Sequence, residues 1–163
     1  MTVEIGKVQK LTSPNPFCLI TSKKGDRTTN IMALSWWTYV SNRPATVAIC
    51  LSAKGLSNHL IRENKEFGLC LPDESIADQA MQCGRCSGRD CDKAAELGIA
   101  LCDAAAIGAK LVTKSQVAME CKVIQEIPAQ DHIMFMAEVV ETHIKPEYRH
   151  LSSVEGYGKL EVR

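Results

Sequence analysis

The sequence has no long hydrophobic run and no excess of charge of either sign. Its longest apolar run, around residues 47–51, is far shorter than the ~20 residues that cross a bilayer as a helix. Residues 1–6 carry no signal-peptide core. Lysine and arginine are scattered, and 19 basic and 19 acidic side chains give a formal net charge of zero. We therefore expect a soluble, cytoplasmic protein that binds neither membranes nor nucleic acid.

The chain also lacks a glycine-rich dinucleotide motif. No Gly-x-Gly-x-x-Gly follows a predicted strand, so no Rossmann site for a nicotinamide dinucleotide is expected. No internal repeat, linker or low-complexity segment divides the sequence. At 163 residues, the chain is long enough to bury one core, and we expect residues 1–163 to form a single domain.

Strand patterns dominate the chain, and helices are expected only in the connections between strands. Alternating or continuous apolar stretches predict strands over residues 3–10, 17–22, 30–41, 45–51, 66–71, 117–124 and 133–144. Capping and stop signals predict helices over residues 58–64, 76–82 and 90–97. Six or seven such strands predict a mainly β fold, in which a closed antiparallel barrel carries appended helices.

The predicted strand over residues 30–41 mixes core residues with hydrogen-bonding side chains. Asn30, Ser35, Thr38 and Ser41 supply donors and acceptors that a strand of a purely apolar core would omit. This mixture is typical of a strand that lines a ligand site. The alternative is a half-buried strand whose polar residues face water.

The next strand leads through a loop of small residues into a predicted helix. Ser57 is the expected N-cap of that helix. The N–H groups at the helix start, the hydroxyls of Ser52 and Ser57 and the ammonium of Lys54 can then converge on an anion such as a phosphate. A serine-capped helix without a ligand is the alternative.

Eight cysteines are present, and we expect reduced thiols because no export signal was found. Five of them lie among apolar residues and are interpreted as small core side chains: Cys18, Cys50, Cys70, Cys102 and Cys121.

Cys83, Cys86 and Cys91 form a second group in the sequence. Three thiolates at this spacing can bind zinc or an iron-sulfur cluster, although such sites normally use a fourth ligand. Another interpretation is a redox-active dithiol of Cys83 and Cys86, with Arg85 and Arg89 favouring the thiolate. Both interpretations stay open at this point.

Five further motifs occur in one order along the chain: Asn30-Ile-Met-x-x-Ser-Trp36; Val40-Ser41 before Pro44; Ser57 with Ile61 and Phe67; Ser87-Gly88 with Asp92-Lys93; and Asp131-His132-x-x-Phe135-x-x-Glu138-Val139. With these motifs the chain resembles the flavin-reductase-like family of FMN-binding split barrels, and within it the flavoredoxin branch. The resemblance extends over nearly the whole chain.

The resemblance implies a flavoprotein that holds FMN and transfers electrons. It implies that the 30–41 strand contacts the isoalloxazine ring, that the 52–57 loop holds the phosphate, and that Ser87-Gly88 makes a second backbone contact. It also implies that His132 lies near the open face of the flavin. The cofactor-binding residues expected on this basis are Asn30, Met32, Ala33, Leu34, Ser35, Trp36, Ser52, Lys54, Ser57, Asn58, Ser87 and Gly88.

The resemblance further implies a homodimer, with NAD(P)H or a redox protein as the electron partner. Trp36 and Trp37 point to opposite faces of one strand, so we expect one of them to face a second subunit. The sequence departs from the general reductase pattern at Cys86, where an aromatic residue often precedes Ser-Gly. This departure favours a flavoredoxin-like electron carrier over a fast NAD(P)H-driven flavin reductase.

Overall fold

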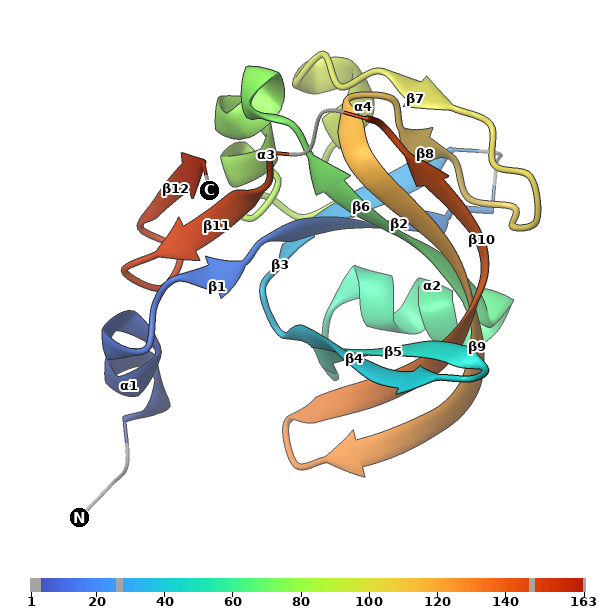
Figure 1. Cartoon of the computed structure of the whole chain (residues 1–163), viewed down its shortest axis with the longest axis horizontal. Coiled ribbons are helices and arrows are strands. Elements are labelled where there is room, and N and C mark those ends of the chain that lie inside the picture. The colour runs from blue at the N-terminus through green and yellow to red at the C-terminus, as the bar shows by residue number, and fades with distance from the viewer. Residues whose placement is uncertain (1–3, 26–27, 147–148, 163) are drawn as a thin grey trace.

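A seven-stranded antiparallel sheet forms the frame of the protein, which we describe from a computed structural model covering residues 4–25, 28–146 and 149–162. The order of its strands is β3-β2-β6-β9-β10-β5-β4 (Figure 1). The prediction of a mainly β, antiparallel fold with helices in the connections is confirmed. The strands are β2 (Cys18–Lys23), β3 (Thr29–Leu34), β4 (Trp37–Asn42), β5 (Ala45–Ser52), β6 (Glu66–Pro72), β9 (Ser115–Ala129) and β10 (His132–Ile144).

The sheet is strongly curved but open, because β3 and β4 lie at its two opposite edges. Leu34 in β3 pairs with Cys18, whereas Trp37 in β4 pairs with Ile49. The prediction of one continuous strand over residues 30–41 is therefore wrong. The chain leaves one edge of the sheet and joins the other within two residues. The Trp36 carbonyl helps to hold this crossing, accepting a hydrogen bond of 2.9 Å from the Cys50 N–H. The result is a split barrel, as the family resemblance implied, and not the closed barrel that the strand count predicted.

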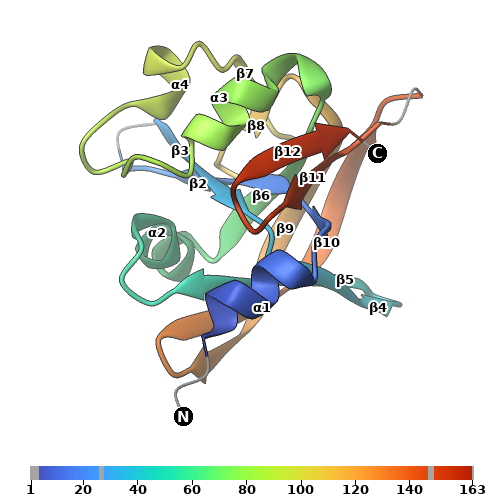
Figure 2. The ribbon, with the colours of Figure 1, turned by 90° about the vertical axis from the view of Figure 1, so that its left-hand side faces the viewer.

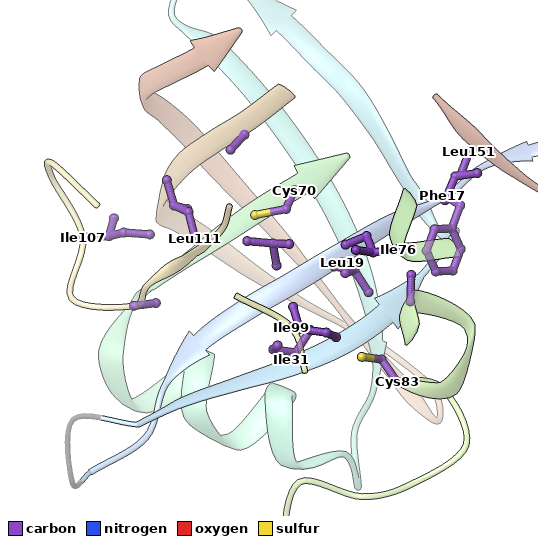
Figure 3. Packing of buried hydrophobic residues seen from close by; sticks show 14 residues of the cluster. Phe17, Leu19, Ile31, Cys70, Ile76, Cys83, Ile99, Ile107, Leu111 and Leu151 are labelled. Atoms are coloured by element: carbon purple, nitrogen blue, oxygen red, sulfur yellow. The ribbon is translucent and has the colours of Figure 1, made fainter. Parts of the chain in front are cut away.

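Both faces of the sheet are buried around β2. Phe17 and Leu19 lie in one apolar cluster, together with Ile31 and residues from the helical connections (Figure 3). Cys18 and Ile20 point to the opposite side, into a cluster inside the curved sheet. Successive side chains of a strand alternate between its faces, so a fully apolar segment such as this one serves two cores.

The connections carry the helices. The helix α2 (Leu56–Asn64) lies between the β2–β3 and β4–β5 regions of the curved sheet (Figure 1), and Ile61 reaches the inner cluster. The outer cluster is covered by η1 (Glu74–Ile76), α3 (Ala77–Gln82), α4 (Lys93–Glu96), β7 (Leu101–Cys102) and β8 (Leu111–Val112). Within the described residues, no helix is both long and apolar enough to cross a membrane.

The two ends of the chain add a second, three-stranded sheet of order β1-β11-β12, which Figure 2 shows beside α3. Its strands are β1 (Asn15–Pro16), β11 (Leu151–Val154) and β12 (Lys159–Val162). The sequence analysis did not predict this sheet. It also predicted a strand over residues 3–10, where the structure has the helix α1 (Ile5–Leu11). Ile5, Val8 and Leu11 recur every three residues, which favours one face of a helix. Val3 lies outside the described residues.

Local capping differs from the prediction in three places. The helix expected from residue 76 is preceded by the turn η1, whose cap is Asp73; its side chain accepts a hydrogen bond of 2.9 Å from the Ser75 N–H. The helix expected over residues 90–97 shortens to α4, because Asp92 caps it instead. The α2 helix begins after Gly55, so Ser57 lies inside its first turn and is not the N-cap. The expected stop at Gly98 agrees with its positive φ of 66°.

The predicted burial of the five apolar-context cysteines is correct for three. Cys18, Cys70 and Cys121 are buried, whereas Cys50 is half-buried and Cys102 is exposed. Cys102 lies on the short hairpin strand β7, which covers the outer cluster and turns one side to solvent. A cysteine that follows apolar residues in the sequence can therefore still lie at the surface.

One buried carboxylate fixes the loop between β7 and β8 to the sheet. Glu120 is fully buried on β9 and accepts hydrogen bonds from the N–H groups of Ala105 (2.8 Å), Ala106 (2.6 Å) and Ile107 (3.2 Å). His143 Nε2 lies 2.7 Å from its Oε1 atom. Burial raises the pKa of Glu120, but these hydrogen bonds outweigh it and hold the pKa below its ordinary value.

We expect Glu120→Gln to lower the free energy of unfolding at pH 7 by about 1–3 kcal/mol, because an amide cannot accept all of these hydrogen bonds. The folded-state pKa is depressed, so the ionised side chain stabilises the fold above its unfolded pKa. This stabilisation is lost as the pH falls below about 5. Urea unfolding of both proteins between pH 7 and pH 4 measures the difference, which should shrink toward pH 4.

Glu126→Gln is the matched control on the same strand. Glu126 pairs with Arg62 at 3.1 Å and also with Lys65, and both basic side chains are more than half exposed. Each such surface pair contributes only about 0–1 kcal/mol. If both variants unfold at the same urea concentration as the unchanged protein, Glu120 does not hold the loop.

Candidate functional site

A cavity of about 400 Å³ lies where the chain crosses from β3 to β4. Its walls come from α1, β3, β5, the start of β10 and the segment after α3. The crossing brings these elements together, because β3 and β5 belong to distant parts of the sheet. Six of the residues predicted from the sequence line this cavity: Met32, Ala33, Leu34, Trp36, Ser52 and His132.

An aromatic pair forms one wall of the cavity. The rings of Trp36 and His132 lie 4.9 Å apart between centroids, with an interplanar angle of 32°. The register of β10 on β5 places His132 directly opposite Ser52. His132 Nδ1 is 2.8 Å from Asp131 Oδ1, and this hydrogen bond lowers the pKa of Asp131. The imidazole is therefore held at the cavity wall by its neighbours on both sides.

The sequence analysis missed other residues that line the cavity, among them Gln9, Cys50, Met81, Gly84, Arg85 and Tyr157. They come from segments for which no ligand contact was predicted. Gly84 lies close to β3, because a Cβ atom there would be 3.4 Å from the Ala33 Cβ. Small side chains at both positions therefore let the segment after α3 approach the strand and form a narrow wall.

Ser35 has a different role from the one predicted. It does not line the cavity. Its N–H donates a hydrogen bond of 2.8 Å to the Tyr157 hydroxyl, and its own hydroxyl lies 2.8 Å from that of Ser153. Burial raises the pKa of Tyr157. Ser35 therefore links the crossing to the C-terminal sheet and positions Tyr157 at the cavity.

A second, smaller cavity of about 140 Å³ lies at the other end of β3 and is lined by Asn30, Gly88 and Lys93, among others. The Asn30 amide donates a hydrogen bond of 2.9 Å to the Ser57 hydroxyl. Its Oδ1 atom is buried and has no hydrogen-bond partner within the described part of the chain. A Cβ atom at residue 88 would collide with that oxygen and lie 3.2 Å from Leu56 Cδ2. Glycine is therefore required at this position.

Lys93 is the principal residue of this cavity that the sequence analysis did not assign. It is only 6% exposed, and its Nζ donates a hydrogen bond of 2.7 Å to the Cys83 carbonyl. Lysine is almost never fully buried unless it is paired. The Asp92-Lys93 motif marked the position, but the burial of the ammonium depends on the loop between α3 and α4 folding over β3.

The start of α2 adjoins the smaller cavity through Leu56. Its N-cap, Gly55, has no side chain to satisfy the first-turn N–H groups. Ser57 and Asn58 are buried in this turn, and the Asn58 Nδ2 atom has no partner among the described residues. Lys54 is exposed, and its carbonyl accepts a hydrogen bond of 3.2 Å from Arg89. Of the residues predicted to bind the phosphate, Ser57 and Asn58 lie at the start of α2, near the smaller cavity. Ser52 instead lines the larger cavity.

The three clustered cysteines do not share a common site. Cys83 is buried in the outer cluster, which also contains Ile76 and Ala80 (Figure 3), and burial raises its pKa to about 11. Cys86 is exposed and Cys91 is half-buried. Within the described residues, no group of three His, Cys, Asp or Glu side chains is arranged to hold a metal ion. The zinc or iron-sulfur interpretation therefore has no geometric support among these residues. The Cys83–Cys86 dithiol stays an alternative interpretation, and the sulfur contact that the structure shows is between Cys86 and Cys91.

Several solved structures share the fold of this chain. Flavoredoxin of Desulfovibrio vulgaris (Miyazaki F) superimposes with a TM-score of 0.87 at 22% identity, over 100% of this chain and 93% of that one. An FMN-binding protein from Thermus thermophilus superimposes with a TM-score of 0.84 at 17% identity, over 94% and 88% of the two chains. At these identities the likeness concerns the fold.

Sequence comparison establishes the family. YddH of Escherichia coli (strain K12), an uncharacterised protein, is 31% identical over 131 residues, which span 79% of this chain and 69% of YddH. The family model described as flavin reductase like domain matches residues 11–155. This range includes every element that lines the two cavities, except most of α1 and the end of the C-terminal hairpin. The chain therefore belongs to the flavin reductase like family, whose chemistry is flavin-dependent electron transfer.

Proposed function

We propose that the protein binds FMN and passes electrons through it to or from NAD(P)H or a redox protein. The observation that carries this proposal is the course of β3. Asn30 opens the strand at a small cavity with a buried lysine, and Met32 to Leu34 line a larger, mostly apolar one. A flavin mononucleotide matches this arrangement, because it has a flat ring system at one end and a charged phosphate at the other.

The larger cavity suits the ring system. Its volume of about 400 Å³ lies within the range of small-molecule sites. Trp36 and His132 provide a flat wall, while Ala33 and Gly84 keep the backbone accessible to the polar edge of a ring. These residues would bind and orient the isoalloxazine and exclude water from one of its faces.

The phosphate end suits the start of α2. Its uncapped N–H groups and the positive end of its dipole attract an anion. The Ser57 hydroxyl and the unpartnered Asn58 amide would donate to phosphate oxygens, and Lys54 and Lys93 add positive charge. The smaller cavity, about 140 Å³, has room for one phosphate group. We propose FMN as the cofactor because the Thermus thermophilus protein of the same fold is described as FMN-binding.

When bound, the flavin itself supplies the one- and two-electron chemistry, so the chain needs only to hold it and leave one face accessible. His132 lines the larger cavity, and 25% of its side chain is exposed to solvent. No Rossmann motif is present in the sequence, so a nicotinamide would stack on the exposed face of the flavin. His132 would then contact its carboxamide.

The protein is also proposed to act as a homodimer. Several large apolar side chains of the described residues are exposed on two strands that β5 separates in the sheet, including Tyr39 and Val40 on β4 and Val140 and Ile144 on β10. The helix α1 buries none of its residues. A second copy of the chain would cover such surfaces, since contiguous exposed apolar area usually marks an interface.

The first prediction tests the cofactor. FMN should bind and give the protein a flavin spectrum, and Lys54→Ala combined with Ser57→Ala should weaken binding by about 2–4 kcal/mol, because each change removes a hydrogen bond or charge contact to the phosphate. Titration followed by flavin fluorescence measures both dissociation constants. His59→Ala, an exposed change on the same helix, is the control. Unchanged affinity in the double variant, or tighter binding of FAD than of FMN, would overturn this assignment.

The second prediction concerns His132. Replacing it with alanine should leave FMN bound but slow reduction by NADH or NADPH about tenfold, the effect of losing one transition-state contact of about 1.4 kcal/mol. Anaerobic stopped-flow mixing with each nucleotide measures the rate. An unaltered rate in His132→Ala would show that the donor approaches elsewhere, and no reduction of the unchanged protein by either nucleotide would leave a redox protein as the partner.

The third prediction concerns the oligomer. Sedimentation at micromolar concentration should show a dimer, and Tyr39→Asp should raise the dimer dissociation constant at least about tenfold, because aromatic side chains at the centre of an interface contribute most of its energy. A monomeric, FMN-loaded protein would contradict the proposed assembly.

A further inference from the structure

Two thiols meet at the surface beside the smaller cavity. Cys91 Sγ lies 3.3 Å from Cys86 Sγ and donates its hydrogen bond to it. A second contact of 3.3 Å joins Cys91 Sγ to the Ser87 carbonyl. Cys86 is exposed, so small molecules in solution can reach it directly. The sulfur atoms are thus in van der Waals contact, and only a small further approach separates them from the bonded distance of about 2.05 Å.

We propose that Cys86 and Cys91 form a redox-active pair, which small anionic disulfides such as glutathione disulfide oxidise to an intramolecular disulfide. The family assignment does not require this pair, and the site is defined by the folded loop between α3 and α4.

The exchange proceeds in two steps. The Cys86 thiolate attacks one sulfur of glutathione disulfide, breaking its S–S bond, forming a mixed disulfide and releasing one glutathione. The Cys91 thiol then loses its proton and attacks Cys86 Sγ, releasing the second glutathione. The two thiol hydrogens of the protein end on the two released glutathione molecules, so the protein loses two electrons and the oxidant gains them.

The surroundings assign the two roles. The accessible sulfur is that of Cys86. The hydrogen bond to Cys86 raises the pKa of Cys91, so Cys91 holds its proton and attacks second. Arg85 and Arg89 lie on either side of Cys86 in the sequence, whereas Asp90 and Asp92 flank Cys91. The positive charge is therefore nearest to Cys86, the thiol that meets the anionic disulfide. Cys83 is excluded, because only 1% of its surface is exposed and it packs in the outer cluster.

The segment between the two cysteines makes contacts with the chain around the smaller cavity. Its Gly88 packs against Asn30, and the Gly88 carbonyl accepts a hydrogen bond of 3.0 Å from Lys24. Arg89 bonds the Lys54 carbonyl in the loop before α2. A Cys86–Cys91 bond would restrain this segment close to its present conformation. On the proposed function, it would therefore lower the ordering cost of binding FMN and tighten binding about three- to tenfold.

Peptide mapping tests the pair directly, in flavin-free protein. Trypsin cleaves after Arg85, Arg89 and Lys93, which separates Cys86 into the peptide 86–89, Cys91 into 90–93 and Cys83 into 66–85. After treatment with glutathione disulfide, the expected product is peptide 86–89 joined to 90–93, and dithiothreitol should separate them. Two free peptides, a glutathione adduct that persists on Cys86, or a bond from either peptide to 66–85 would overturn the proposal.

Two variants sharpen the result. Cys91→Ser should trap the mixed disulfide, so that peptide 86–89 carries one glutathionyl group. Cys102→Ser removes the other exposed thiol and should leave the 86–91 disulfide unchanged. A Cys91→Ser protein that accumulates no adduct would show that Cys86 does not attack the oxidant.

The effect on the flavin is measured separately. The dissociation constant for FMN should be about three- to tenfold lower for the oxidised protein than for the reduced protein. Equal or weaker binding would overturn the coupling. A chain that forms the disulfide but binds no flavin in either state would overturn the proposed function and not the assignment of the cysteine pair.

Discussion

Burial of β2 on both faces is the constraint on which the rest of the structure depends. Cys18 and Ile20 serve the cluster inside the curved sheet, while Phe17 and Leu19 serve the cluster under the helical connections. Because the outer face must also be covered, the chain between β6 and β9 cannot remain a simple loop. Its helices pack on β2 and β3, and in doing so they bring the segment after α3 against β3.

The open edge of the sheet has a direct functional consequence. The crossing at Ser35 and Trp36 places β3 and β4 at opposite edges, and the larger cavity opens at this point. A closed barrel would fill its interior with side chains. The split instead leaves space beside β3. Asn30 provides a polar side chain at one end of this strand, and Ala33 lets the segment at Gly84 approach closely at the other end. The polar contacts of Ser35 hold the C-terminal sheet in place and so form the wall at Tyr157.

The segment from Cys83 to Lys93 contains both buried and exposed side chains within eleven residues. Cys83 packs in the core and Lys93 is buried with its ammonium on the Cys83 carbonyl, whereas Cys86 remains at the surface. The close approach of Gly84 to Ala33 and of Gly88 to Asn30 fastens the loop to β3 at two points. The loop therefore contributes to the walls of both cavities.

Periodicity and local chemistry determined much of this protein from the sequence alone: the strands β5, β6 and β10 within a residue or two, and the position of α2. Six residues of the larger cavity were implied by the family resemblance of the sequence motifs. Local patterns could not reveal where the sheet splits, since residues 30–41 are equally compatible with one strand or two. The burial of Lys93 and the pairing of Cys86 with Cys91 were also decided by the tertiary structure. Both depend on how the α3–α4 loop folds back on β3, and spacing along the chain carries no information about that contact.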